Sequence, residues 1–209
     1  QYRMAPGIGW LVSNVFYEGK LQNGARTVPN FYSDGPRFIK NQVTWVDTSS
    51  LGEKSYHQDD MGTSIYNRCE ADLIIGILNK LYADQVLVCE LKGLVDEGEP
   101  AIGVICMYGE QKRLISKKFN ENVWSDEFKS LVKIGTVDSY QGKENRIVIL
   151  SVTNSSANKS PRFLKSPNRI NVALSRAMDR LVIVGSAKMW IGKNENLPLG
   201  MVVSLMSSN

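Results

Sequence analysis

Three Gly-Lys pairs are the first candidates for chemistry in this chain of 209 residues, because Gly-Lys-Ser/Thr ends the loop that cradles nucleotide phosphates. The pairs lie at residues 19–20, 142–143 and 192–193. None is followed by Ser or Thr, and none has another glycine five residues earlier. Asp47 follows the apolar run 43–46 and has the place of an acid that holds Mg²⁺. Without a phosphate loop we interpret it as a strand terminus or a loop residue that forms hydrogen bonds.

The polar residues 138–144 stand directly before a run of Ile, Val and Leu that is typical of a buried strand. Two arginines, Arg169 and Arg176, fall two turns apart on nearly one face of a predicted helix. Spacing alone indicates a solvated basic face there, and Arg3 alone would be an ordinary terminal residue. These residues by themselves leave open whether they act on a ligand.

The sequence contains only three cysteines and one histidine, which limits the possibilities for metal binding and for nucleophilic catalysis. Cys69, Cys89 and Cys106 lack metal-ligand spacing, and we predict buried reduced thiols of a cytoplasmic protein and no metal site. His57 lies in a polar loop, so we predict a solvated side chain rather than a catalytic base. A hydrolase that pairs Cys69 or Cys106 with His57 therefore has no supporting pattern.

Composition is that of an ordinary soluble domain, with 43% hydrophobic and 22% charged residues. No apolar run approaches the roughly 20 residues that cross a bilayer, so we expect no membrane contact. A net charge of +4 is compatible with a nucleic-acid partner and is weak support for one. The chain begins at Gln1 without an initiator Met, so we expect a processed chain or a piece of a longer one.

Apolar periodicity predicts short strands that alternate with helices, which indicates one α/β domain with a mostly parallel sheet. Helices are predicted over 8–16, 65–82, 111–119 and from Pro167 through Ala177, and strands over 43–46, 102–107, 134–137, 146–152 and 181–184. Residues 22–42, 49–63 and 153–167 read as loops, and 84–100 has no assignment beyond a turn at 95–100. Ligands of such sheets lie beyond the carboxyl ends of the strands, so we expect Asp47, Tyr108 and residues 138–144 and 151–154 at that edge.

Five stretches in order resemble motifs of superfamily 1 helicases, in the branch that contains the nonsense-mediated decay helicase and senataxin. They are residues 1–4 with 16–21, Asn67 with Glu70 and Ala71, 102–108 with Gln111, 137–144, and 169–177. The resemblance covers residue 1 to about 190. It implies a three-layer RecA-like domain, the second of two, with ATP in the cleft between them. Residues 1–209 would then be this single domain without the first, P-loop domain, and 191–209 its C-terminal extension.

The resemblance also implies roles for individual residues. Arg3 and Arg176 match two arginines whose guanidinium groups stabilise a transferred γ-phosphoryl group. Tyr2 matches a residue that stacks near the adenine, and Glu144 an acid that hydrogen-bonds the sugar. The remaining assignments are Gly142 for close backbone approach, Gln141 for coupling of the two sites, and Tyr108 and Thr136 for contacts to nucleic acid. For each, the alternative is a loop hydrogen bond within the domain.

Three positions depart from the family pattern: Ala5 stands where His is usual, Tyr140 for the commoner Phe, and Lys143 for the commoner Arg. None removes a group with an implied role. The resemblance implies an ATP-dependent helicase or translocase whose partners are single-stranded DNA or RNA and the first RecA-like domain. ATP with Mg²⁺ would be the cofactor, with the Mg²⁺ ligands on the first domain, so this chain alone would be an inactive half-site. The alternative is a non-catalytic nucleic-acid or protein binding module that keeps the fold, which the residues before Gln1 in the parent would decide.

Overall fold

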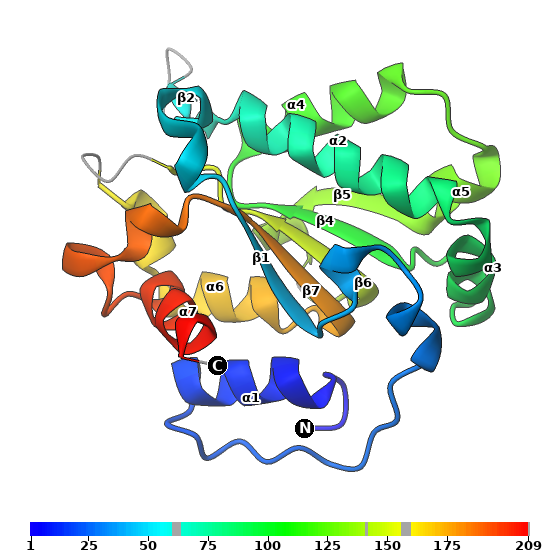
Figure 1. Ribbon diagram of the computed structural model, residues 1–209, viewed down its shortest axis with the longest axis horizontal. Helices are drawn as coiled ribbons and strands as arrows, with labels where there is room; N and C mark the ends of the chain where they lie inside the picture. Colours follow the sequence, from blue (N-terminus) through cyan, green and yellow to red (C-terminus); the bar gives the residue numbers. More distant parts are fainter. Residues whose placement is uncertain (60–63, 141, 156–159, 209) are drawn as a thin grey trace.

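Five parallel strands form the centre of the structure, a computed structural model that describes residues 1–59, 64–140, 142–155 and 160–208. Their order across the sheet is β1-β7-β6-β4-β5, and every neighbouring pair runs parallel (Figure 1). The strands are β1 (Val43–Asp47), β4 (Ile102–Cys106), β5 (Val132–Thr136), β6 (Asn145–Ser151) and β7 (Ala177–Gly185). The predicted parallel sheet is therefore confirmed.

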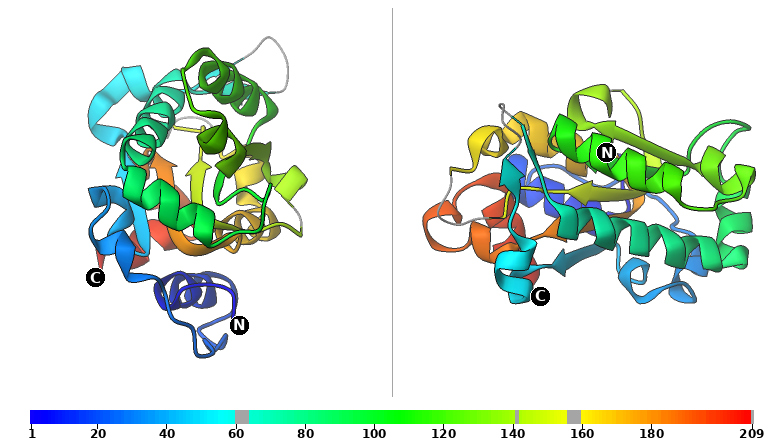
Figure 2. Two further views of the ribbon diagram at one scale, coloured as in Figure 1. Left: turned by 90° about the vertical axis from the view of Figure 1, so that its right-hand side faces the viewer. Right: turned by 90° about the horizontal axis from the view of Figure 1, so that it is seen from above.

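Helices cover both faces of this sheet, which gives the three layers expected of a RecA-like α/β domain (Figures 1 and 2). One layer holds α1 (Pro6–Phe16), α6 (Pro167–Leu174) and α7 (Pro198–Ser207). The other holds α2 (Arg68–Ala83), α3 (Gln85–Gly93), α4 (Gly109–Glu121) and α5 (Asp126–Leu131). Short 3₁₀ segments connect these elements at Asn30–Ser33, Arg37–Ile39, Ser49–Ser55, Val137–Tyr140, Arg162–Lys165, Ala187–Trp190 and Gly192–Asn194.

The central strands are apolar on both faces because both faces are covered. In β6, Ile147 and Ile149 belong to the core under α2 and α4, whereas Val148 and Leu150 belong to the core under α1 and α6. All four side chains are fully buried. Side chains alternate along a strand, so a continuous apolar run is what a strand between two helical layers requires.

Helix α2 begins later than predicted. Asn67 is its N-cap, and the Asn67 side chain accepts a hydrogen bond from the Glu70 N–H over 3.0 Å. The residues before the cap form β3 (Ile65–Tyr66), which pairs antiparallel with β2 (Gln58–Asp59). Apolar Ile65 thus continues the helical periodicity without being helical.

Two helices occur where none was predicted. Asp84 caps α3 by accepting a hydrogen bond from the Leu87 N–H over 3.0 Å, so most of the unassigned segment 84–100 is helical. Ser125 caps α5 in the same way, over 3.2 Å to the Phe128 N–H. At six residues, α5 is too short to show a periodic pattern.

Helix α6 ends at Leu174, so the predicted helical face of Arg169 and Arg176 is wrong. Ala177 already pairs with Asn145 as the first residue of β7, which ends the helix before Arg176. Arg169 remains on α6 and forms an ion pair with Asp138 at 3.4 Å. Arg176 lies in the turn that enters the sheet.

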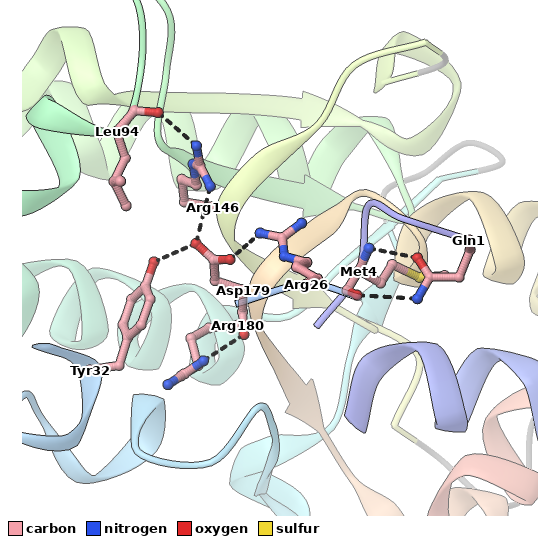
Figure 3. Close-up of polar contacts among 8 residues, drawn as sticks. All are labelled: Gln1, Met4, Arg26, Tyr32, Leu94, Arg146, Asp179 and Arg180. Atoms are coloured by element: carbon pink, nitrogen blue, oxygen red, sulfur yellow. Dashed lines mark hydrogen bonds and ion pairs between the residues drawn. The ribbon is translucent and has the colours of Figure 1, made fainter. Parts of the chain in front are cut away.

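The segment between α1 and β1 is anchored to the sheet by a buried cluster around Asp179 of β7 (Figure 3). The Asp179 carboxylate forms ion pairs with Arg26 and, at 3.7 Å, with Arg146, and accepts a hydrogen bond from the Tyr32 hydroxyl over 3.1 Å. Burial, then the charge of Asp179, raises the pKa of Tyr32. The Arg180 guanidinium lies 4.1 Å from the centre of the Tyr32 ring. A loop without strands is therefore fixed by charge pairing.

Residues of the predicted C-terminal extension pack on the domain. Leu199 and Val202 of α7 are fully buried in the core that contains Ile8 and Leu11 of α1. None of the helices in the described part of the chain is long and apolar enough to span a membrane.

Candidate functional site

Three charged side chains from distant parts of the sequence meet at the amino-terminal edge of the sheet. Arg3 precedes α1 and forms an ion pair with Glu144, the residue before β6. Arg176 donates a hydrogen bond from Nη1 to the Lys143 carbonyl oxygen over 3.2 Å. Arg176 also lies near enough to Arg3 and Glu144 for their charges to shift its pKa. The structure thus brings together Arg3, Glu144 and Arg176.

Main-chain hydrogen bonds at the sheet edge hold the two arginines in place. The Asn145 N–H donates to the Arg176 carbonyl oxygen over 3.0 Å, which continues the β6–β7 ladder. The Ala5 N–H donates to the Met178 carbonyl oxygen over 2.7 Å and ties the segment of Arg3 to β7. Both arginines therefore project from backbone that the sheet fixes.

Gln1 closes the turn that presents Arg3 (Figure 3). Its Oε1 accepts a hydrogen bond from the Met4 N–H over 2.7 Å, and its Nε2 donates to the Met4 carbonyl oxygen over 3.1 Å. Met4 itself is buried in the core. The Gln-Tyr-Arg-Met stretch is thus a closed turn with Tyr2 and Arg3 at its exposed tip.

The cluster is net positive, with two guanidinium groups against one carboxylate. Burial, then the charge of Arg3, lowers the pKa of Arg176, and Glu144 partly opposes this shift. The side chains of Arg3 and Glu144 are 43% and 40% exposed, so both are accessible to a ligand. Planar guanidinium donors held near one another match the oxygens of a phosphate group.

The location of this cluster corrects the expectation that residues 138–144 lie at the carboxyl edge. Val137–Tyr140 does follow β5 at that edge, but residues 142–144 lead into the amino end of β6. Since β5 and β6 are both parallel to β4, the chain must cross the sheet between them. The Tyr140 hydroxyl donates a hydrogen bond to the Lys133 carbonyl oxygen over 2.7 Å and so attaches the connection between β5 and β6 to the beginning of β5.

A depression of about 990 Å³ adjoins Glu144 and is lined by Gly142, Lys143, Lys133 and Glu99 among others. A hydrogen bond with Lys143, then burial and the charge of Lys143, lowers the pKa of Lys133. Gly142 has a φ of +80° and open space around its Cα, so its backbone is accessible. Gln141 lies outside the described residues.

Tyr2 is the most exposed of the aromatic side chains that the structure describes, at 81%. Its ring lies beside Gly24, where a Cβ atom would collide with ring carbons. The Gly24 N–H donates to the Gln1 carbonyl oxygen over 2.8 Å and holds that backbone against the turn. Tyr2 is therefore an accessible aromatic ring in the turn that presents Arg3.

Thr136 and Tyr108 lie together at the opposite, carboxyl edge of the sheet. Thr136 ends β5 and pairs in register with Cys106, two residues before Tyr108. Thr136 is half-buried, whereas the Tyr108 side chain is only 3% exposed. Of these two side chains, only Thr136 is accessible enough to contact a nucleic-acid strand.

A buried polar network links α2, α4 and the end of β6, and we did not predict it from the sequence. Glu70 is fully buried and accepts hydrogen bonds from the Ser151 hydroxyl and the Thr153 N–H, each over 2.7 Å. Gln111 accepts from the Asn67 N–H over 2.7 Å and donates to the Ser151 hydroxyl over 3.0 Å. Burial raises the pKa of Glu70 to about 8, and its hydrogen bonds act against this.

This network explains why Asn67, Glu70 and Gln111 accompany the other motifs. They hold the segment after β6, where Thr153 adopts a φ of +69°. The Asn-x-x-Glu spacing was the available signal, because it places an N-cap three residues before an acid.

The thiols and His57 differ from prediction in part. His57 is 6% exposed rather than solvated, since its Nδ1 accepts a hydrogen bond from the Ser155 N–H over 3.2 Å. Cys106 is buried as predicted, but Cys89 is exposed on α3. Burial raises the pKa of both Cys106 and Cys69, the opposite of what a nucleophilic thiolate needs. The arrangement does not favour a cysteine hydrolase.

The donor set fits phosphate better than a metal ion. Arg3 and Arg176 are cations, and the described residues contain no group of three His, Cys, Asp or Glu side chains that could hold a metal. The charge and geometry of the cluster are therefore suited to an anionic group such as phosphate.

Comparison with known proteins gives relatives over nearly the whole chain. Residues 1–188 match a family described as an AAA domain. The chain is 33% identical over 195 residues to a regulator of nonsense transcripts 1 homolog of Neurospora crassa, with 90% of this chain and 16% of that protein covered. It is 35% identical over 193 residues to the ATP-dependent helicase NAM7 of Saccharomyces cerevisiae, with 90% and 18% covered.

A third relative, the ATP-dependent helicase upf1 of Schizosaccharomyces pombe, is 31% identical over 197 residues, with 90% of this chain and 19% of that protein covered. The chain thus spans less than a fifth of the length of these relatives. Its parallel three-layer sheet and its ordered motifs agree with the family match. The chain belongs to this AAA domain family, in the superfamily 1 helicase branch of the nonsense-mediated decay helicase, as a second RecA-like domain.

Proposed function

We propose that this chain is the second motor domain of an ATP-dependent helicase or translocase and forms one wall of a cleft that holds ATP. The convergence of Arg3, Glu144 and Arg176 carries this proposal, because three segments far apart in the sequence supply one positive, accessible cluster. The ATP-dependent helicases among the relatives support the same reaction class.

The two arginines would act on the phosphate end of the nucleotide. Bound ATP with Mg²⁺ supplies the phosphoryl group whose transfer to water drives the motor. Arg3 and Arg176 donate N–H groups toward the oxygens on which negative charge grows in the transition state. Their backbone is already fixed by β6 and β7, so little reorganisation is needed. The P-loop and the Mg²⁺ ligands would belong to the first domain.

The remaining residues of the edge would recognise the nucleoside. Tyr2 offers an exposed ring on which adenine can stack. Glu144 would exchange Arg3 for a sugar hydroxyl when nucleotide binds, and Gly142 allows close approach of the backbone. We assign Gln141 to the coupling between this edge and the nucleic-acid edge.

Single-stranded DNA or RNA would lie at the opposite edge, near Thr136. Such strands are held mainly through phosphates and stacking, which half-exposed hydroxyl groups and helix termini at a sheet edge can provide. Two ligands at two edges of one rigid sheet would allow ATP-driven domain closure to move the nucleic-acid strand.

The free thiols of Cys69, Cys89 and Cys106 support a cytoplasmic location.

The test is the nucleic-acid-stimulated ATPase of the parent protein with Arg176→Ala. We expect turnover to fall by about 10³-fold or more, as for an arginine that acts in phosphoryl transfer. Arg176→Lys should recover only part of the activity, since lysine keeps the charge without the planar fork. Near-wild-type turnover of Arg176→Ala would overturn the proposal.

A matched control is Arg113→Ala, because the Arg113 side chain is 75% exposed on α4 in an ion pair with Glu110. It should leave ATP turnover unchanged. The isolated chain provides a second check. As half of a site it should not hydrolyse ATP, and steady turnover by this chain alone would refute the half-site assignment.

A further inference from the structure

A groove of about 980 Å³ is lined by residues of β1 and α2. Strand β1 forms the edge of the sheet opposite β5 (Figure 1). The apolar lining of the groove comes from β1, α2 and two 3₁₀ segments and consists of Phe38, Trp45, Val46, Leu51, Leu73 and Ile77. None of the residues assigned to ATP or to nucleic acid lines it. The groove is therefore separate from the helicase sites.

The groove runs along an open sheet edge. In the described part of the chain, β1 pairs with β7 on one side and with no strand on the other. Its residues are half-buried or exposed, unlike those of the central strands. Along β1 the side chains alternate, so Val46 packs against the core under α2, whereas Trp45 packs against the opposite core, where its Nε1 donates to the Gly185 carbonyl oxygen over 2.8 Å. Open edges offer main-chain donors and acceptors to a further extended segment.

Gly76 makes the groove wider on the helical side. It lies in the middle of α2 and lines the groove, and a Cβ built on it would meet no atom within 4 Å. Glycine in a helix interior is destabilising relative to alanine. Internal packing does not require it here, so the missing side chain leaves room for something outside the domain.

The rim of the groove carries basic side chains whose charges are not balanced by acidic partners among the described residues. Arg37, Lys54 and Lys80 line it, and no ion pair that the structure describes involves any of them. The acid at the rim, Asp72, is already paired with Lys118 at 2.7 Å. The charge that complements this rim is negative.

We propose that this groove binds an acidic peptide segment of a partner protein in an extended conformation. A bulky apolar side chain of the peptide occupies the space between Val46 and Gly76, and flanking carboxylates face Arg37, Lys54 and Lys80. The peptide backbone lies along the free edge of β1. A peptide fits better than a nucleic-acid strand, since the floor is aliphatic as well as aromatic and the edge offers backbone pairing that phosphates cannot use.

The test is fluorescence anisotropy of the 209-residue chain with a labelled ten-residue peptide of alternating aspartate and leucine or phenylalanine. We expect saturable binding that weakens with salt. Gly76→Leu fills the groove and should weaken binding by at least about tenfold. The matched control Gly93→Leu changes another helical glycine that has open space around it, outside the groove, and should bind as the wild type does.

A charge-reversal pair gives an independent variant that does not touch the core. Lys54→Glu with Lys80→Glu should also weaken binding at least about tenfold, and a peptide with lysine in place of aspartate should not bind. Circular dichroism checks that each variant is folded. Equal binding by wild type and Gly76→Leu overturns the proposal. So does binding of a labelled oligo-dT strand that depends on Gly76 in the same way, because the occupant would then be nucleic acid.

Discussion

Arg3 and Glu144 form an ion pair across the amino-terminal edge of the sheet, although they lie far apart in the sequence. The pair joins the turn before α1 to the residue that enters β6, and Arg176 adds a second guanidinium beside it. Without nucleotide, Glu144 balances one of two positive charges. A polyphosphate would compete for Arg3 and release Glu144 for a hydroxyl group.

If the proposed function holds, Arg3 and Glu144 should differ in their kinetic effects in the parent protein. Arg3→Ala should lower kcat for ATP by roughly 10²-fold or more, since it removes donors to the charge of the transition state. Glu144→Gln should mainly raise KM for ATP, because a sugar contact is equal in ground and transition states. Steady-state kinetics with oligo-dT or oligo-U present measures both. A loss of kcat in Glu144→Gln larger than that in Arg3→Ala would contradict these roles.

Tyr2 should contribute to nucleotide affinity through its ring alone. Tyr2→Ala should raise KM for ATP by about tenfold, the range of a lost stacking contact, while Tyr2→Phe should behave as the wild type does. The exposed ring makes no core contact whose loss would confuse the result. If both variants bound ATP normally, stacking on Tyr2 would be excluded.

The sheet and most helices could be predicted from the sequence. A strand that is buried on both faces, such as β6, is a continuous stretch of apolar residues, and this pattern indicates a buried parallel strand. Helix boundaries were less predictable, since Ile65 continues the apolar period of α2 although Asn67 starts the helix. Ala177 likewise fits the stripe of α6 but pairs with Asn145. An apolar pattern within one segment does not show where a capping residue starts a helix or where a residue pairs with a distant strand.

The candidate site followed from the resemblance rather than from spacing. Arg3, Glu144 and Arg176 belong to three segments, and nothing local to any of them indicates that they meet. The crossing between β5 and β6 also reversed the edge at which residues 142–144 lie. The Asp179 cluster was not predictable, because each of its arginines looks like an ordinary surface residue in the sequence.

Asp179 should be important for the stability of this domain and not for its chemistry. The carboxylate is fully buried between Arg26, Arg146 and Tyr32, so Asp179→Ala leaves two largely buried guanidinium groups without the carboxylate that balances their charge. The expected loss is about 3 kcal/mol or more in the free energy of unfolding. Urea denaturation of the isolated chain measures it.

Asp96→Ala is the matched control for this variant, since Asp96 is exposed in the turn after α3. It should change the free energy of unfolding by less than about 0.5 kcal/mol. Similar stabilities of the two variants would mean that the buried cluster does not anchor the segment between α1 and β1.

Glu70 should give the domain a stability that falls as pH rises. Its pKa is about 8 in the folded chain against 4.5 as the reference value, because burial disfavours the charged carboxylate. The folded state therefore binds the proton more tightly between these values, and the free energy of unfolding decreases from pH 4.5 to about pH 8. Glu70→Gln keeps the shape without the charge and should remove this part of the slope. Urea unfolding of both proteins at intervals across this pH range tests the prediction.

The titratable neighbour Cys106 has a pKa raised by burial and then by Glu70, so it stays protonated throughout this range. Parallel pH profiles for wild type and Glu70→Gln would show that Glu70 does not change protonation on folding.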